Sequence, residues 1–299
     1  TVPCSFGLLM KIALIGGDAR MRIVARCFSE DGTTVATYLL PEGAPGACSS
    51  LAAALAGADA VILPLPLTRD GRHVLTEGAR DDAPTLRTVF SRAEDETLFF
   101  AGNVTPDVAA IAAGAGVRSL VDYYGEEVRF RSAAATAEAA VAHAALHLPI
   151  VLSDGTYAVI GGGRIATALL RLLLPLGAHV RLFARSPAQR EAAAALGAEA
   201  LPLSPPGDGG IRVGDDVRAV FCTVPAPVFP AEAVFRLPRG ILFYDLGCGA
   251  IDRSAAAAHG VLLPPSAGLP GKYAPESAGM DLYRAIRARL AEGKGGILS

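Results

Sequence analysis

The sequence predicts an α/β fold made of two doubly wound parallel sheets joined by a bridging helix, with a C-terminal helix that crosses back. Two observations predict it. Short apolar runs break into glycines and are followed by helix-period patterns, at residues 11–28 and again at 156–174. Strands and helices then alternate through a chain of 299 residues, which is long enough for two cores and favours parallel sheets.

Composition restricts the class of protein. Hydrophobic residues make up 52% of the chain and aromatics 6%, so we expect a core mainly of Ala, Leu and Val. A net charge of −2 with scattered Lys and Arg disfavours a nucleic-acid surface. No apolar run reaches the roughly 18 residues that a membrane span needs. Five cysteines without a C-x-x-C pattern predict reduced thiols in a cytoplasmic protein.

The first domain is expected over residues 10–135, after an extension at 1–9 that lacks the features of a signal peptide and precedes a natural start at Met10. It is Rossmann-like in pattern. It lacks a third glycine and an acidic residue after its second strand, so the dinucleotide is not assigned to it. The expected elements are strands at 11–15, 34–40, 60–63, 97–100 and 117–121, helices at 21–28 and 105–113, and a loop or a hairpin excursion at 68–95.

An Ala-rich helix over 136–148 leads into the second half, and residues 136–150 are expected to bridge the two domains. His143 and His147 stand four residues apart on this helix and can in principle share a metal ion. No H-E-x-x-H pattern accompanies them, so packing or surface roles are favoured and no metal site is predicted.

The second domain, expected over 151–277, begins with a strand at 156–160 that runs into Gly161, Gly162 and Gly163. Read as G-x-G-x-x-A, the turn reverses at Gly161, approaches a pyrophosphate at Gly163 and lets helix and strand pack at Ala166. The helix that follows opens with Arg164 and Ile165, and its first amides can bind phosphate. A glycine turn without a ligand is the alternative.

The end of the next strand, residues 179–184, indicates which dinucleotide binds. An NAD site is expected to place Asp or Glu there, whereas this chain has Ala184, Arg185 and Ser186. A guanidinium and a hydroxyl suit a 2′-phosphate, so NADP is favoured and NAD stays possible. In the alternative interpretation Arg185 is an ordinary solvated residue.

Two later strands, at 219–223 and 241–245, are expected to end beside the adenosine and nicotinamide. The residues at these ends are Thr223, Val224, Pro225, Leu246 and Gly247. Beyond them the pattern predicts a surface loop at 202–216, a short strand at 261–263, a Gly/Pro loop at 264–278 and a C-terminal helix over 278–292 within a last segment at 278–299.

Several motifs together carry a family likeness. They are Gly16-Gly17-Asp18-Ala19-Arg20, Thr136 with Glu138, the glycine turn followed by Ala184-Arg185-Ser186, and Gly268-Leu269-Pro270-Gly271 with Ala274-Pro275 and Ser277-Ala278-Gly279. In this order, over about residues 11–290, the chain resembles the family of dipicolinate synthase A subunits. Two departures are Ala166, where the family can have Gly, and a plain Ser-Ala-Ala-Ala at 132–135, which puts a substrate contact there in doubt.

The resemblance implies NAD(P)-dependent oxidation of dihydrodipicolinate, or of 4-hydroxy-tetrahydrodipicolinate, to dipicolinate in the mother cell of a spore-forming bacterium. It also implies a partner, the flavoprotein-like B subunit of dipicolinate synthase, and a first domain that binds the small dicarboxylate substrate. Separately, we expect a homo-oligomer. For its carboxylates we expect Arg20, Lys272 and Arg69, with the backbone amides of Gly16, Gly17 and Gly271.

Three further residues are expected at the catalytic site, each with an open alternative. Asp18 can orient Arg20, act as the base, or simply cap a helix. Asn103 can donate to a carboxylate or form a turn. Glu138 is a second base candidate or only a favourable charge at a helix start.

Two rival functions remain open. A 2-hydroxyacid or shikimate-type dehydrogenase would need a catalytic His with a carboxylate partner, or a Lys-Asp pair, and His259 is poorly placed for that role. A non-catalytic NADP-binding subunit would bind the same ligands without turnover.

Overall fold

The computed structural model describes residues 10–78, 82–204 and 211–292, so the expected extension at 1–9 lies outside the described residues. The chain divides into two compact units. Unit 1 comprises residues 1–131 together with 274–299, and unit 2 comprises 132–273. In the described part of the chain no helix is both long enough and apolar enough to span a membrane.

Unit 1 is built on a five-stranded parallel sheet in the order β2-β1-β3-β4-β5. Both faces of β1 are buried, which explains why its sequence is a continuous apolar run. The strands are β1 (Lys11–Ile15), β2 (Thr34–Tyr38), β3 (Ala60–Ile62), β4 (Leu98–Ala101) and β5 (Leu120–Asp122).

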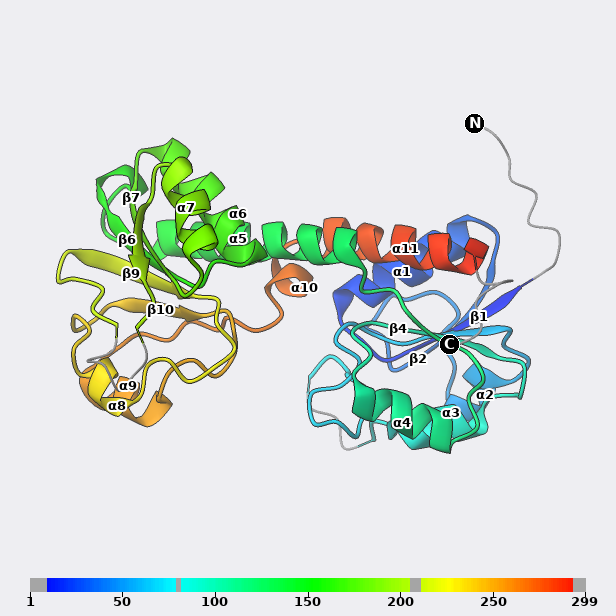
Figure 1. Cartoon of the computed structure of the whole chain (residues 1–299). Coiled ribbons are helices and arrows are strands. Elements are labelled where there is room, and N and C mark those ends of the chain that lie inside the picture. Colours follow the sequence, from blue (N-terminus) through cyan, green and yellow to red (C-terminus); the bar gives the residue numbers. More distant parts are fainter. Residues whose placement is uncertain (1–9, 79–81, 205–210, 293–299) are drawn as a thin grey trace. The chain divides into compact units, whose positions relative to one another are not determined.

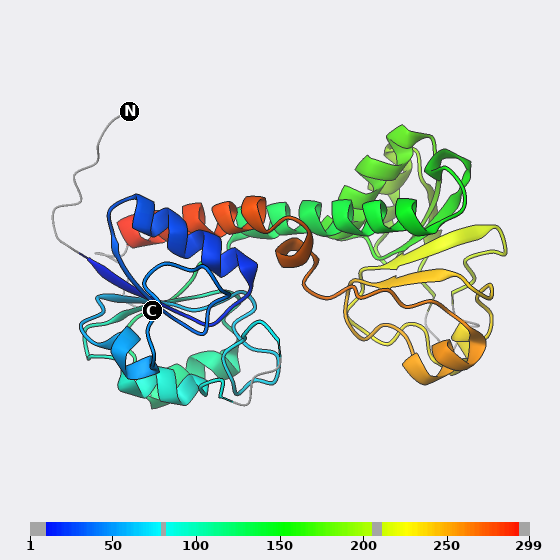
Figure 2. The ribbon, with the colours of Figure 1, turned by 180° about the vertical axis from the view of Figure 1, so that it is seen from behind.

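Helices cover both faces of this sheet. Its helices are α1 (Ala19–Glu30), α2 (Leu51–Leu55), α3 (Leu86–Arg92), α4 (Pro106–Gly114) and α11 (Pro275–Glu292). α1 and α11 lie side by side on one face, and α2, α3 and α4 lie on the other, as Figures 1 and 2 both show. A Cβ built on Gly279 of α11 would lie 2.8 Å from the carbonyl oxygen of Arg20, so glycine permits the close approach of α11 to α1. The C-terminal helix therefore crosses back to the first sheet, as the sequence predicts.

Unit 2 contains the second five-stranded parallel sheet, in the order β10-β9-β6-β7-β8. Its strands are β6 (Thr156–Ile160), β7 (His179–Ala184), β8 (Glu199–Pro202), β9 (Val217–Cys222) and β10 (Leu242–Asp245). The α-helices that begin in this unit are α6 (Arg164–Leu173), α7 (Pro187–Ala195), α8 (Ala231–Val234), α9 (Arg253–His259) and α10 (Leu269–Tyr273), with short 3₁₀ turns at Leu152–Asp154 and Leu174–Leu176. The predicted fold class is confirmed by these two helix-flanked parallel sheets.

α5 (Glu126–His147) begins in unit 1 and ends in unit 2. It starts earlier than the Thr136 expected from the sequence. The first turn carries Glu126 and Glu127, which favour a helix N-terminus through the helix dipole. Phe130 in this early part is 57% exposed although Val128 is buried, so the apolar residues here do not all lie on one face, as the usual helix pattern would require.

Four segments differ from the expected local structure. The expected loop at 68–95 contains α3, whose start is capped by the Thr85 hydroxyl. The expected loop at 264–278 contains α10 and the first turn of α11. The strand expected at 261–263 reduces to a single bridge between Leu242 and Leu262. Part of the surface loop expected at 202–216 lies outside the described residues, while Ile211 and Val213 within it are buried.

Candidate functional site

The glycine turn of unit 2 follows β6 and is held tightly by its neighbours. Gly161 adopts a φ of +108°, a conformation that glycine reaches without strain. Its amide donates to the carbonyl of Phe183 at 2.8 Å, and a Cβ at this position would lie 2.4 Å from Oγ1 of Thr223. Only glycine therefore fits where the chain leaves the sheet.

The next two glycines differ in what surrounds them. A Cβ on Gly162 would lie 2.7 Å from the side chain of Gln189, so the turn packs against α7. Gly163 is the N-cap of α6 without a side-chain cap, and no atom lies within 4 Å of the position a Cβ would take. The start of α6 thus combines amide donors with open space, which suits a diphosphate. Arg164 lies exposed at this start, and Ile165 is half-buried beside it.

The end of β7 presents the two residues expected to select the cofactor. Ala184 is fully buried, while Arg185 is exposed and Ser186 is half-buried. Ser186 is the N-cap of α7, but its hydroxyl makes no capping hydrogen bond. A residue that sequence reasoning missed, Arg190, donates from the first turns of α7 back to the strand end.

Thr223 and Val224, at the end of β9, adjoin the glycine turn, and Gly247 after β10 lies against Val224 and Pro225. That these residues and Leu246 line the cofactor stays a prediction. The Thr223 amide and hydroxyl both donate to the carbonyl of Ile160, at 2.8 and 3.0 Å. A Cβ on Gly247 would lie 2.3 Å from the carbonyl oxygen of Val224, so the two loops touch. Asp245, which sequence reasoning also missed, is 5% exposed and accepts from the amides of Gly249 and Ala250. Its carboxylate shapes the loop after β10.

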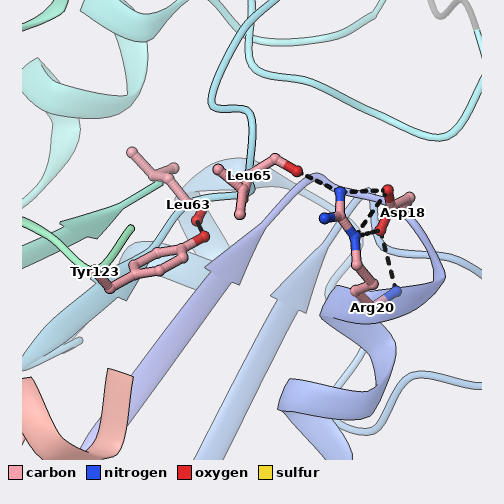
Figure 3. Close-up of polar contacts among 5 residues, drawn as sticks. All are labelled: Asp18, Arg20, Leu63, Leu65 and Tyr123. Carbon is pink, nitrogen blue, oxygen red and sulfur yellow. Dashed lines mark hydrogen bonds and ion pairs between the residues drawn. The ribbon is translucent and has the colours of Figure 1, made fainter. Parts of the chain in front are cut away.

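In unit 1 the strand-to-helix turn after β1 is organised by Asp18 and Arg20 (Figure 3). Asp18 is the N-cap of α1 and accepts from the Arg20 amide at 3.1 Å. The Arg20 guanidinium also donates to it, from Nε to Oδ1 at 2.9 Å and from Nη2 to Oδ2 at 2.8 Å. Nη2 additionally donates to the carbonyl of Leu65. Among the roles left open for Asp18, the geometry favours capping α1 and orienting Arg20.

The expectation that the backbone amides of Gly16 and Gly17 bind a substrate carboxylate is wrong, because both amides donate hydrogen bonds within the protein. The Gly16 amide donates to the backbone carbonyl of Tyr38 at 2.9 Å, and the Gly17 amide donates to the backbone carbonyl of Leu75 at 2.6 Å. The second partner comes from the segment after β3, which folds back over this turn; a Cβ on Gly16 would lie 2.5 Å from the Leu75 carbonyl oxygen. This turn is filled by protein, whereas the turn at Gly163 is open.

Asn103 lies at the same sheet edge as Arg20. Gly102, directly before it, packs against Leu65, whose carbonyl binds Arg20. Asn103 is exposed, has a φ of +64°, and donates its amide to Oδ1 of Asp122 at 3.1 Å. Asp122 also accepts from the amides of Val104 and Tyr124, so this carboxylate, which the sequence did not single out, holds the loop that presents Asn103.

The remaining expected residues are not joined to the Asp18–Arg20 pair by any interaction among the described residues. Lys272 is exposed on α10 and Glu138 is exposed on α5, both in unit 2. Arg69 is exposed in the segment after β3 of unit 1, and Gly271 is buried within α10. Their roles stay predictions.

The histidines of α5 stack on each other, with ring centroids 3.8 Å apart. Nδ1 of His143 lies 2.8 Å from the Tyr244 hydroxyl, and Nδ1 of His147 donates to the His143 carbonyl at 2.8 Å. Burial, and then the charge of His147, lower the pKa of His143. His259 is buried and binds the Leu237 carbonyl through Nε2. Throughout the described ranges, no three His, Cys, Asp or Glu side chains gather as metal ligands would.

Comparisons with known proteins agree with this architecture. The chain is 26% identical to the dipicolinate synthase A subunit of Bacillus subtilis (strain 168) over 293 residues, which cover 95% of this chain and 96% of the relative. A crystal structure of the dipicolinate synthase A chain from Bacillus subtilis superposes with a TM-score of 0.77 at 26% identity, covering 96% of this chain and 97% of that one.

A more distant structure shows the general type of fold. The apo-structure of D-lactate dehydrogenase from Escherichia coli has a TM-score of 0.62 at 16% identity, covering 95% of this chain and 98% of that one. Residues 11–124 match the family model described as the N-terminal domain of the dipicolinate synthase A subunit. The resemblance seen in the sequence is therefore confirmed: residues 11–124 match this N-terminal domain family, and nearly the whole chain, with its dehydrogenase-like fold, is similar to dipicolinate synthase A subunits.

Proposed function

We propose that this chain is the dehydrogenase subunit of a dipicolinate synthase, which oxidises dihydrodipicolinate to dipicolinate with NADP⁺ as hydride acceptor. The observation that carries the proposal is the open glycine turn at Gly161–Gly163 in a chain related to the dipicolinate synthase A subunit over 95% of its length. NAD⁺ and the hydrated substrate, 4-hydroxy-tetrahydrodipicolinate, are the nearest variants of the same reaction.

The residues of unit 2 fit a dinucleotide. The amides at the start of α6 would bind the diphosphate, and Arg185 with Ser186 would bind the 2′-phosphate. Thr223, Val224, Pro225, Leu246 and Gly247 would line the nicotinamide side, because ligands of open parallel sheets lie outside the carboxyl ends of the strands. The bound cofactor would supply an acceptor for hydride, and the protein supplies its position.

In unit 1, Arg20 is the strongest candidate for a substrate carboxylate. Its side chain is 7% exposed, and Asp18 and Leu65 hold two of its guanidinium nitrogens. Nη1 has no acceptor among the described residues and can donate to a ligand. Because Asp18 balances the charge of Arg20, the contribution to binding is a fixed hydrogen bond more than a net positive charge. Asn103, at the same edge, can donate to the second carboxylate.

The proposed oxidation also needs an acceptor for the ring proton. Both oxygens of Asp18 already accept from Arg20, so Asp18 is a poor base. Glu138 is exposed and has no partner among the described residues, which leaves it as the base candidate. Formation of an aromatic ring makes loss of hydride and proton favourable, so positioning supplies most of the catalysis.

The proposal extends to the setting of the enzyme. The flavoprotein-like B subunit would be its partner, the chain would form a homo-oligomer, and the reaction would take place in the mother-cell cytoplasm during sporulation. The 2-hydroxyacid dehydrogenase alternative has one specific observation in its favour, the Asp70–His73 pair of unit 1, in which Oδ2 and Nδ1 lie 2.6 Å apart.

The test is direct. Purified chain, with and without the partner subunit, is incubated with the product of the lysine-pathway synthase and NADP⁺, and NADPH and dipicolinate are measured by absorbance. Appearance of both supports the proposal. D-Lactate with NAD⁺ is the comparison arm, and turnover there alone would favour the 2-hydroxyacid alternative. Binding of NADP⁺ without turnover of either substrate would indicate a non-catalytic subunit.

A further inference from the structure

Arg190 joins two successive peptide units at the point where β7 gives way to α7. Its Nη1 donates to the carbonyl of Ala184 at 2.9 Å and to the carbonyl of Arg185 at 2.8 Å. Arg190 is itself fixed in the first turns of α7, where its amide donates to the Ser186 carbonyl at 3.2 Å. A planar guanidinium on a helix is a rigid donor, so it constrains both carbonyls at once.

The two carbonyls depend on Arg190 to different degrees. The Ala184 carbonyl also accepts from the amide of Leu203 at 3.1 Å, so the strand end is held by the sheet edge as well. The Arg185 carbonyl has Arg190 as its donor, and no other described residue donates to it. Loss of Arg190 would therefore release the Arg185 peptide while leaving β7 in place.

The side chains of Arg185 and Ser186, which this peptide carries, have no hydrogen-bond or ion-pair partner among the described residues. Arg185 is exposed, and its guanidinium pairs with no described side chain. The Ser186 hydroxyl, although it stands at the N-cap of α7, does not cap the helix. Pro187 at the first helical position has no amide hydrogen that would need a cap. A guanidinium and a hydroxyl thus stand side by side without partners among the described residues.

We propose that Arg190 is a positioning residue for cofactor discrimination: it holds the Arg185–Ser186 peptide so that both side chains meet the 2′-phosphate of NADP together. The role rests on the proposed NADP site. Two donors held in place lose less conformational freedom on binding than two free ones, and this benefit is confined to a ligand that carries the phosphate. Arg190 therefore strengthens NADP binding and leaves NAD binding nearly unchanged.

Binding of NADP⁺ and of NAD⁺ to the full chain, measured by calorimetry, tests this role. In Arg190→Gln the affinity for NADP⁺ falls about tenfold, the equivalent of about 1.4 kcal/mol of lost hydrogen bonding, and the affinity for NAD⁺ changes less than twofold. Arg190→Lys behaves like Arg190→Gln, because an ammonium keeps the charge but not the planar fork. Arg171→Gln, an exposed position on α6, is the matched control and keeps the wild-type ratio.

A second measurement does not depend on any nucleotide. Amide hydrogen exchange of the peptide that covers residues 184–187 becomes faster in both Arg190 variants and stays unchanged in Arg171→Gln. The role is overturned if Arg190→Gln keeps the wild-type preference for NADP⁺, or if Arg190→Lys retains a preference that Arg190→Gln loses, since charge alone would then be responsible. Wild-type chain that binds neither nucleotide overturns the proposed NADP site itself, and this role with it.

Discussion

Thr223 and Gly161 meet so closely that a methyl group on Gly161 would lie 2.4 Å from the Thr223 hydroxyl oxygen. That hydroxyl is fixed by donating to the carbonyl of Ile160, one residue before the glycine. The turn after β6 is therefore closed on its inner side by the end of β9. At Gly163, by contrast, no described atom beyond the neighbouring backbone lies within 4 Å of the position that a Cβ would take.

This difference predicts that two similar substitutions affect different properties, one the stability of the fold and the other the binding of NADP⁺. Gly161→Ala introduces both a clash and a φ of +108° that alanine tolerates poorly, so the free energy of unfolding falls by about 2 kcal/mol or more. Chemical denaturation with urea, followed by circular dichroism, measures it. A variant as stable as wild type would mean that the turn relaxes at little cost.

Gly163→Ala is the matched case on the open side. The backbone φ of −88° suits alanine and no atom obstructs the new methyl group, so stability stays within about 1 kcal/mol of wild type. The methyl group fills the space proposed for the diphosphate, so the affinity for NADP⁺ falls by about tenfold or more. Unchanged affinity in a folded Gly163→Ala variant would remove the diphosphate from this turn.

Arg185→Asp tests the preference for NADP. A carboxylate at the end of β7 repels a 2′-phosphate and accepts from a ribose hydroxyl, so the preference shifts from NADP⁺ toward NAD⁺. The measurement is the ratio of the two dissociation constants, which should change by about tenfold or more. An unchanged ratio would make Arg185 an ordinary exposed residue.

Asp18→Asn tests the pair in unit 1. The substitution leaves a buried guanidinium without its charge partner, and the stability falls by about 2 kcal/mol, less than for a fully buried pair because Asp18 is 25% exposed. Urea denaturation measures the loss. Asp59→Asn is the control, because the exposed Asp59 carboxylate accepts, among the described residues, only a hydrogen bond from the backbone amide of Lys11. This substitution should lower stability less. Equal losses of stability in the two variants would mean that the ion pair between Asp18 and Arg20 adds no more to stability than an exposed hydrogen bond does.

His143 predicts a dependence of stability on pH. Its folded-state pKa is lowered by burial and by His147, so the unfolded chain, in which histidine titrates at about 6.5, binds the proton more readily. Stability is therefore full above about pH 6.5 and declines as the pH falls below it. In His143→Gln this decline is smaller, whereas His179→Gln, at an exposed site on β7, keeps it. Parallel curves for wild type and His143→Gln between about pH 5 and 8 would contradict the assignment.

The sequence predicted best what short-range patterns determine. The strand, turn and helix around Gly161 are contiguous, and so are the strand end and residues 184–186, so apolar period and turn chemistry were sufficient to locate them. The order of motifs then located the family. The parallel direction of the strands also follows from the alternation of strands and helices, because neighbouring parallel strands need a crossover connection.

Contacts between distant residues were beyond such patterns. Gly16 and Gly17 have the same local appearance as the later glycine turn, but Leu75 covers them from a segment nearly sixty residues further along the chain. The carboxylates of Asp122 and Asp245 hold loops by accepting hydrogen bonds from backbone amides, and such bonds produce no periodic pattern in the sequence. Arg190 was missed because its partners are carbonyls, and any residue type offers a carbonyl.

The packing of α11 on α1 has a consequence for synthesis of the protein on the ribosome. Unit 1 takes its first strands from the beginning of the chain and its last helix from residues 275–292, with all of unit 2 translated in between. Until α11 emerges, Ile23 and Phe28 of α1 lack the surface that covers them in the native state. The nascent first unit therefore keeps apolar surface exposed until the C-terminal helix has been translated, and it is open to aggregation for longer than the second unit.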